Sequence, residues 1–100
     1  MIHVIAIITT KPGKRAEVLD LFNANVPTVL AEQGCIEYGP TIDAPGLSHA
    51  AFGHDTFVVV EKWESPEALA AHAKAPHMVT YGVKTAHLIE SRAIHVLAPA

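Results

Sequence analysis

The chain has 100 residues, half of them hydrophobic, and a formal net charge of −3 at pH 7. This length and apolar content predict one globular domain and exclude a disordered chain. The slight excess of acidic residues, with no basic run, argues against nucleic acid and anionic membrane surfaces as partners. Because so short an apolar domain buries a modest share of its surface, we expect a homodimer.

Cys35 is the only cysteine, so no disulfide can form within the chain. Nothing beside it in the sequence would activate the thiol, and an inert side chain is expected. The N-terminal sequence MIHVIAIITTKPG has neither the basic region nor the cleavage site of a signal peptide, and its apolar run is too short to span a bilayer. We therefore predict a cytoplasmic protein.

The chain begins with a predicted strand and helix. Residues 2–10 are short and β-branched and end at Lys-Pro-Gly, which is typical of a buried strand. From residue 14, apolar residues recur at helical spacing as far as Gly34, which suits a helix C-cap, over about five turns. Pro27 inside this helix predicts a kink or break near Asn25, where an irregular turn could face a ligand.

Two strands and a loop follow. Residues 35–44 alternate between apolar and polar, which predicts an edge or half-exposed strand, interrupted or bulged at Gly39-Pro40. Residues 45–55 have no period and form a long loop, a kind of segment that often covers a site. The run TFVVVEKW at 56–63 predicts the next strand.

The C-terminal part predicts two short helices and a last strand. Ser65, as N-cap before a proline and a glutamate, starts a helix at residue 66. Pro76 ends that helix near residue 74 and opens another, which runs to about residue 86. Residues 91–99 are rich in β-formers and predict the final strand.

The predicted order of elements is strand, helix, strand, strand, helix, strand. Two split β-α-β halves in this order predict a ferredoxin-like α+β domain, with an antiparallel sheet covered on one face by helices. The second face of the sheet also needs a cover. A second subunit's sheet would provide it.

His72 and His77 in the segment EKWESPEALAAHAKAPHM pose the main functional question. They can be metal ligands, a catalytic base with a substrate contact, or two ordinary structural histidines. Five residues on an ideal helix correspond to a rotation of about 140°, so the two rings point apart unless the Pro76 break reorients one. Zinc-binding helices place histidines four apart, so we predict no metal site.

His72 is the best candidate for a base, because its helical neighbours Ala68, Leu69 and Ala73 make an apolar, small-residue surface. A core histidine bonded to a backbone carbonyl is the alternative. The residues expected to contact a flat aromatic ligand are Trp63, Phe57, His77, Tyr81, Asn25 and Tyr38. Each of them can instead serve packing alone. The sequence has no glycine-rich phosphate loop, GxSxG, CxxC, paired-carboxylate or nucleotide motif.

Four segments resemble the antibiotic biosynthesis monooxygenase domains, and within them the quinol monooxygenases. These segments are VIAIITTKPGKR, VPTVLAEQGCIEYGP, FVVVEKWES and ALAAHAKAPHMVTYG, which together span nearly the whole chain. The resemblance implies a ferredoxin-like dimer whose sheets form a shared α/β barrel, with a ligand cavity between each sheet and its helices.

The resemblance also implies oxygenation of a quinol or related phenolic substrate by dioxygen, with no metal, flavin or other cofactor. A deprotonated hydroquinone is electron-rich enough to give an electron directly to dioxygen, so the protein supplies a base and a water-poor cavity. An imidazole suits proton transfer at neutral pH. By this hypothesis His72 is the base, and Trp63, Phe57, His77 and Tyr81 position the ring.

Other branches and roles remain as alternatives. Haem-degrading relatives use an Asn, Trp and His set, but the Trp position falls on His72 and the later His position on Gly82, which does not favour haem breakdown. Isomerases of phosphorylated quorum-signal sugars share the spacing of His72 and His77, although their helix-one histidine falls at Val26. A pocket lined by lysine or arginine would favour them. A non-catalytic quinone-binding dimer is the third alternative, since this fold hosts unrelated functions.

Overall fold

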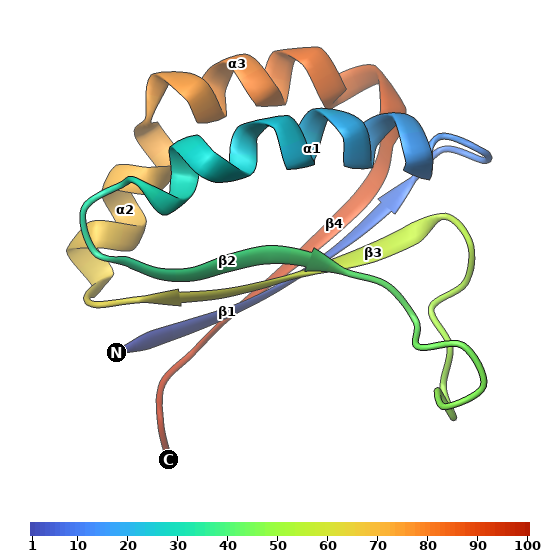
Figure 1. The fold of residues 1–100 in the computed structure, drawn as a ribbon, viewed down its shortest axis with the longest axis horizontal. Coiled ribbons are helices and arrows are strands. Elements are labelled where there is room, and N and C mark those ends of the chain that lie inside the picture. The colour runs from blue at the N-terminus through green and yellow to red at the C-terminus, as the bar shows by residue number, and fades with distance from the viewer.

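The computed structural model describes residues 1–100 as one four-stranded sheet with three α-helices on one of its faces (Figure 1). The strands are β1 (Ile2–Thr10), β2 (Cys35–Thr41), β3 (Thr56–Trp63) and β4 (Ile89–Leu97). The helices are α1 (Arg15–Leu30), α2 (Pro66–Lys74) and α3 (Pro76–Thr85), and a 3₁₀ turn (Ala86–Leu88) leads into β4. All pairings are antiparallel and the strand order is β2-β3-β1-β4. This confirms the ferredoxin-like α+β fold.

The hydrophobic core lies between the sheet and the helices. Side chains alternate between the two faces of a strand, so every second residue of β1 and β3 points at the helices. Val18, Phe22 and Val29 of α1 pack against this face. The inward residues of β3 include Phe57 and Trp63, whose side chains are fully buried.

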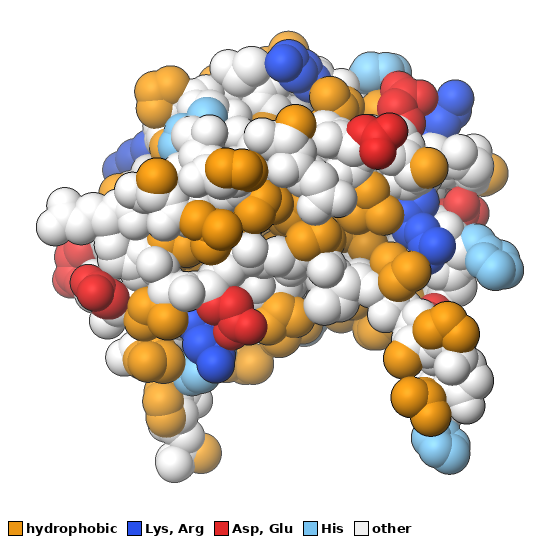
Figure 2. All heavy atoms as spheres, in the orientation of Figure 1, with side chains coloured by type: hydrophobic (Ala, Val, Ile, Leu, Met, Phe, Trp, Pro, Cys, Tyr) orange, Lys and Arg blue, Asp and Glu red, His pale blue; other side chains and the backbone are white.

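The opposite face of the sheet has no covering layer (Figure 1). The β1–β3 register pairs Ile5 with Val60 and Ile7 with Val58, and these four side chains lie on that open face. Figure 2 shows this side as a hollow between two projections, the C-terminal end of the chain and the loop after β2. The sheet therefore presents an apolar, concave surface at its centre.

The connection between α2 and α3 is as the sequence predicts. The Ser65 hydroxyl accepts a hydrogen bond from the Ala68 N–H at 3.1 Å and caps α2. Ala75 has an extended backbone, with φ −61° and ψ 139°, so α2 ends there and α3 begins at Pro76. The chain thus changes direction between His72 and His77.

Gly34 ends the turn after α1 in a conformation that suits glycine. Its φ is +85°, and a Cβ there would lie 2.5 Å from the Cβ of Ala68 on α2. The Gly34 carbonyl also accepts a hydrogen bond from the Glu64 N–H at 2.8 Å. The missing side chain lets α2 pack directly on the turn that carries Glu32.

Three local predictions need correction. No break occurs near Asn25: α1 continues through Pro27, whose carbonyl accepts a bond from the Ala31 N–H at 3.2 Å, so the last turn is complete despite the lost donor. The register shift in β2 falls between Cys35 and Glu37, while Gly39 and Pro40 pair regularly with β3. An edge strand tolerates a proline whose nitrogen does not face its neighbour.

The last strand begins two residues earlier than predicted, because the 3₁₀ turn delivers the chain into the sheet at Ile89. β2 lies at the edge of the sheet, as its mixed pattern predicts. None of the helices combines the length and the hydrophobicity that crossing a bilayer requires.

Candidate functional site

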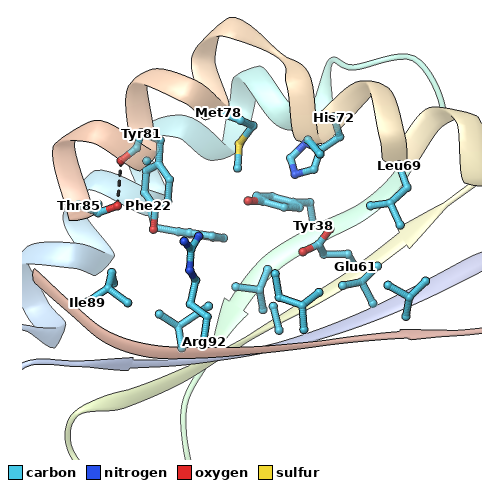
Figure 3. A pocket seen from close by; sticks show the side chains of 18 residues that line it. Phe22, Tyr38, Glu61, Leu69, His72, Met78, Tyr81, Thr85, Ile89 and Arg92 are labelled. Atoms are coloured by element: carbon cyan, nitrogen blue, oxygen red, sulfur yellow. Dashed lines mark hydrogen bonds between the residues drawn. The ribbon is translucent and has the colours of Figure 1, made fainter. Parts of the chain in front are cut away.

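A cavity of about 400 Å³ lies between the sheet and the helix layer (Figure 3). Of the 18 residues that line it, 13 are hydrophobic. Ile94 and Val96 of β4 line it and are more than half exposed, so the cavity opens over that edge strand. The lining groups able to take part in chemistry are Tyr38, Glu61, His72, Tyr81 and Arg92. These five side chains come from five different elements.

His72 reaches the cavity wall from the last turn of α2, and its ring points into the space between Met78 and Tyr38 (Figure 3). Its Nδ1 lies 2.8 Å from Oε2 of Glu32. The Nε2 of His77 lies 2.7 Å from the same oxygen. The Pro76 break therefore does reorient His77, and one carboxylate joins both imidazoles.

This arrangement fixes how His72 presents its second nitrogen. A carboxylate accepts hydrogen bonds but does not donate them, so Nδ1 of His72 carries the proton that faces Glu32. In the neutral ring Nε2 then holds a free electron pair. It makes no hydrogen bond, and no buried polar atom lacks a partner, so Nε2 is open rather than sealed. A free imidazole nitrogen at a cavity wall is the geometry of a general base.

The same three side chains are the group best placed to hold a metal ion, since one ligand atom of each lies within 4.8 Å of the others. Two imidazoles and a carboxylate suit Zn²⁺ or Fe²⁺. A tetrahedral ion with bonds of about 2.0–2.1 Å needs ligand atoms roughly 3.4 Å apart. The two imidazole nitrogens are instead 2.7 and 2.8 Å from a single oxygen, the spacing of two N–H donors on one acceptor.

Glu61 places a carboxyl group in the same wall. Its Oε1 accepts a hydrogen bond from the Trp63 indole N–H at 2.9 Å, and only 7% of the residue is exposed. Burial raises the pKa of Glu61, and the Trp63 hydrogen bond and the nearby His72 oppose that rise. Glu61 is therefore a buried carboxyl beside an imidazole, a pairing common in sites that move protons.

Aromatic side chains form the remaining wall. Phe22 stacks on Tyr38 with ring centroids 5.2 Å apart and meets Tyr81 edge to face at 5.9 Å. Burial raises the pKa of Tyr38 far above its usual range and that of Tyr81 to about 12, so both phenols stay protonated at neutral pH. They can donate hydrogen bonds to a ligand oxygen but do not act as bases.

The residues predicted from sequence occupy three places. His72, Tyr38 and Tyr81 line the cavity. Trp63 and Phe57 are fully buried behind its wall, where Trp63 lies against the His72 ring, with centroids 4.6 Å apart, and bonds Glu61. His77 and Asn25 lie outside the cavity.

These two outer residues act on the wall indirectly. His77 touches Glu32, and the Asn25 amide donates a 3.4 Å hydrogen bond to the Met78 sulfur. Their direct contact with a ligand, like that of Trp63 and Phe57, stays a prediction.

Glu32, Glu61 and Arg92 contribute to the site but are not among the site residues predicted from the sequence. The alternation of β3 places Glu61 between Val59 and Trp63 on the inward face, so its place in the site can be predicted from the sequence. Arg92 lies on the same face of β4 as Ile94 and Val96. That face can be identified as the inward one only when the pairing of β4 with β1 is known. Glu32 has no comparable signal, because it meets a partner 40 residues away.

Cys35 is partly buried, and burial, followed by the charges of Glu32 and Glu61, raises the pKa of its thiol. A thiol held in its protonated form is a poor nucleophile. This agrees with the inert role expected from the sequence.

Residues 1–82 match the family described as Antibiotic biosynthesis monooxygenase. Among curated proteins, the chain is 42% identical over 102 residues to "Probable quinol monooxygenase YgiN" of Escherichia coli K12, covering 99% of this chain and 98% of that protein. The same protein in Shigella flexneri matches equally well.

Among solved structures, Rv0793 from Mycobacterium tuberculosis superposes with a TM-score of 0.82 at 29% identity, covering 99% of this chain and 94% of that one. The antibiotic biosynthesis monooxygenase homologue of Nitrosomonas europaea gives a TM-score of 0.85 at 19% identity, covering 99% and 98%, and supports the fold alone. The family match spans most of the chain and the YgiN similarity nearly all of it. The chain belongs to the antibiotic biosynthesis monooxygenase family.

Proposed function

We propose that this protein is a monooxygenase that oxidises a quinol or related phenolic aromatic with dioxygen, without metal, flavin or other cofactor. Family membership and the YgiN similarity support an oxidoreductase. One observation supports the cofactor-free mechanism most directly. His72 lies in the wall of an apolar cavity, where Glu32 holds its Nδ1 and its Nε2 is free.

The reaction begins with proton removal. Nε2 of His72 takes a hydroxyl proton from the quinol, and the Glu32 carboxylate stabilises the imidazolium that forms. The quinolate then gives an electron to dioxygen, and the two radicals combine. One oxygen atom enters the ring and the other leaves as water, so quinol and dioxygen yield a hydroxyquinone and water. Dioxygen takes up four electrons, two from the oxidation of the quinol to a quinone and two from the ring carbon that gains the hydroxyl and loses its hydrogen, so no further reductant is needed.

The cavity supports each of these steps. Its hydrophobic lining favours a flat aromatic ring and excludes most water, which strengthens electrostatic interactions inside it. The protonated phenols of Tyr38 and Tyr81 are donors for the oxygens of the bound ring. Glu61, beside His72, is the second group able to hold a proton during turnover.

Oxygen uptake tests this proposal. A freshly reduced naphthoquinol is mixed with the protein in metal-chelated, flavin-free buffer, with spontaneous autoxidation as background. We expect uptake above background, reduced roughly 10²–10⁴-fold in His72→Ala, the usual contribution of a general base. His49→Ala is the matched control, because His49 lies in the exposed loop before β3. Uptake equal to background, or a fully active His72→Ala protein, contradicts the proposal.

The sugar-phosphate isomerase alternative receives less support. Its criterion was a pocket lined by lysine or arginine, and the cavity holds one arginine, no lysine and 13 hydrophobic residues. A polar sugar would leave most of that lining unmatched. A quinone-binding protein without turnover remains the other alternative. Tight quinone binding with no oxygen uptake would identify it.

We also propose that the protein is a homodimer joined through the open face of the sheet. Ile5, Ile7, Val58 and Val60 give that face an apolar centre, and a matching sheet would cover it. Light scattering after size exclusion should give twice the chain mass, and Ile7→Lys should give one chain mass. Val79→Lys, on the exposed surface of α3, is the control. A monomeric native protein would contradict the dimer. The cytoplasmic location stays a prediction.

A further inference from the structure

Arg92 is an exposed cation at the open edge of the cavity, where it lines the wall without a partner in the protein. It extends from β4 toward the helix layer, on the side of Tyr81 and Thr85 (Figure 3). It forms no ion pair, and its guanidinium makes no hydrogen bond. The other arginine of the chain, Arg15, donates to the carbonyls of Gly53 and Thr56 at 3.2 and 3.1 Å and joins a loop to the sheet. Arg15 has a structural task, whereas Arg92 has none.

The cavity is electrostatically divided. At one end the Glu61 carboxyl and the His72 imidazole influence each other. At the other end Arg92 lies on the side of Tyr81 (Figure 3), where burial raises the pKa of the phenol and the charge of Arg92 opposes that rise. The lining between the two ends is mainly apolar. A ligand that uses the whole cavity therefore meets a proton-accepting group, a hydrophobic middle and a positive charge.

We propose that Arg92 forms an anion subsite, and that the preferred ligand is an aromatic ring carrying a carboxylate. This inference rests on the proposed function for the identity of the ring. A guanidinium pairs with a carboxylate through two parallel N–H···O bonds, which fixes the position of the ring as well as adding affinity. The anionic group lies at Arg92, and a hydroxyl of the ring lies toward His72.

The two ends also select orientation. In the reversed orientation the carboxylate would approach the acidic Glu61, which repels it, and Arg92 would be left without an anion. An aromatic without a carboxylate fits the apolar middle but leaves Arg92 unpaired. Arg92 is thus a specificity-determining residue that distinguishes ligands by the substituent far from the base.

Binding of two non-oxidisable probes tests the subsite without relying on turnover. The first, 2-naphthoate, carries a carboxylate, and the second, 2-naphthamide, has nearly the same shape and no charge. Calorimetric titration of the native protein should show about tenfold tighter binding of 2-naphthoate, the equivalent of one charge-assisted hydrogen bond in a partly open site. Arg92→Gln should bring the two affinities together, and Arg92→Lys should keep part of the preference.

Lys84→Gln is the matched control, since it removes one positive charge from α3 outside the cavity. It should leave the preference for 2-naphthoate unchanged. Equal affinities in the native protein, no measurable binding of 2-naphthoate, or a preference that survives Arg92→Gln would overturn the subsite. Glucose 6-phosphate, an anion without an aromatic ring, should bind more weakly than 2-naphthoate, and the reverse order would overturn the aromatic part.

The subsite and the reaction can fail separately. Oxygen uptake from a neutral naphthoquinol, lost in His72→Ala, together with equal affinities for the two probes, would retain the reaction and reject the subsite. A carboxylate preference that depends on Arg92, without any oxygen uptake, would retain the subsite and reject the reaction.

Discussion

The two faces of the sheet come from the same strands but have different environments. Along β3, Phe57, Val59, Glu61 and Trp63 face the helices, while Val58, Val60 and Lys62 face the open side. The helix-facing set is buried and builds the core and the cavity wall, whereas every member of the other set is partly exposed.

This contrast shows that the environment of a side chain in β3 depends more on the face of the sheet it occupies than on its residue type. Both faces carry valines, and both carry a charged residue. The charge on the covered face, Glu61, is buried beside His72. The charge on the open face, Lys62, forms a 3.3 Å ion pair with Glu37 in which both side chains are more than 40% exposed. Pairs of neighbouring substitutions can therefore test the two faces separately.

The largest difference should come from truncating neighbours in β3. Phe57→Ala removes a fully buried ring and should lower the free energy of unfolding by about 3–5 kcal/mol, through lost burial and the cavity left behind. Val58→Ala, one residue along, should cost about 1 kcal/mol, because its side chain is half-buried. Chemical denaturation of both variants measures these values.

Measuring both variants, Phe57→Ala and Val58→Ala, at several protein concentrations makes this comparison more informative. If the open face joins two subunits, the loss from Val58→Ala grows with protein concentration, since dimerisation adds to stability, while the loss from Phe57→Ala stays nearly constant. Equal losses for the two variants at any concentration would show that the faces do not differ as described.

A smaller effect is expected from the residue that orients His72. Glu32→Gln replaces an acceptor by an amide that can also donate to Nδ1, which shifts the ring toward the tautomer with the proton on Nε2 and lowers the population of the form that acts as the proposed base. In the oxygen-uptake assay kcat should fall about 10–100-fold with little change in KM. Glu37→Gln, on the exposed ion pair, is the control and should keep the native kcat. A larger change in KM than in kcat would indicate a role in binding instead.

The smallest effect is a pH-dependent gain in stability. Burial raises the pKa of Glu61 in the folded state, so over the interval between its unfolded and folded pKa the native protein keeps a proton that the unfolded chain releases. The contribution of Glu61 is complete below the ordinary carboxyl pKa and is lost as pH rises through the raised pKa. Glu61→Gln keeps an acceptor for Trp63 without the charge. At neutral pH it should therefore be about 1 kcal/mol more stable than the native protein.

Melting curves at acid and neutral pH check this expectation, and the gain should vanish at acid pH. The neighbouring Lys62→Gln should change stability by less than about 0.5 kcal/mol, because its ion pair is exposed. A gain of equal size at both pH values would rule out a buried charge as its cause.

Much of the fold could be predicted from the sequence because its signals are local. The Ser65 cap, the two helix-starting prolines and the alternation in β3 each depend on residues a few positions apart. The strand order follows from the sequence of elements, since split β-α-β halves permit few arrangements. Local signals were misleading where packing overrides them, as at Pro27, which lies inside an unbroken helix.

The site was predictable only in part. His72 was identified from its own helix, because its neighbours there are small and apolar. Glu32 and Arg92 act through contacts that join distant segments, so their roles depend on the register of β4 and on the packing of α2 against a turn. Trp63 was identified as important, but its ring lies behind the cavity wall.

Gly34 makes the His72–Glu32 contact depend on a residue that does not line the cavity. Its missing Cβ allows the contact with Ala68, and the same contact brings α2, with His72, to the turn that carries Glu32. A side chain at this position would push the helix away and separate His72 from Glu32. In a genetic screen scored only by activity, substitutions of Gly34 would be grouped with those of His72, although they alter distance rather than chemistry.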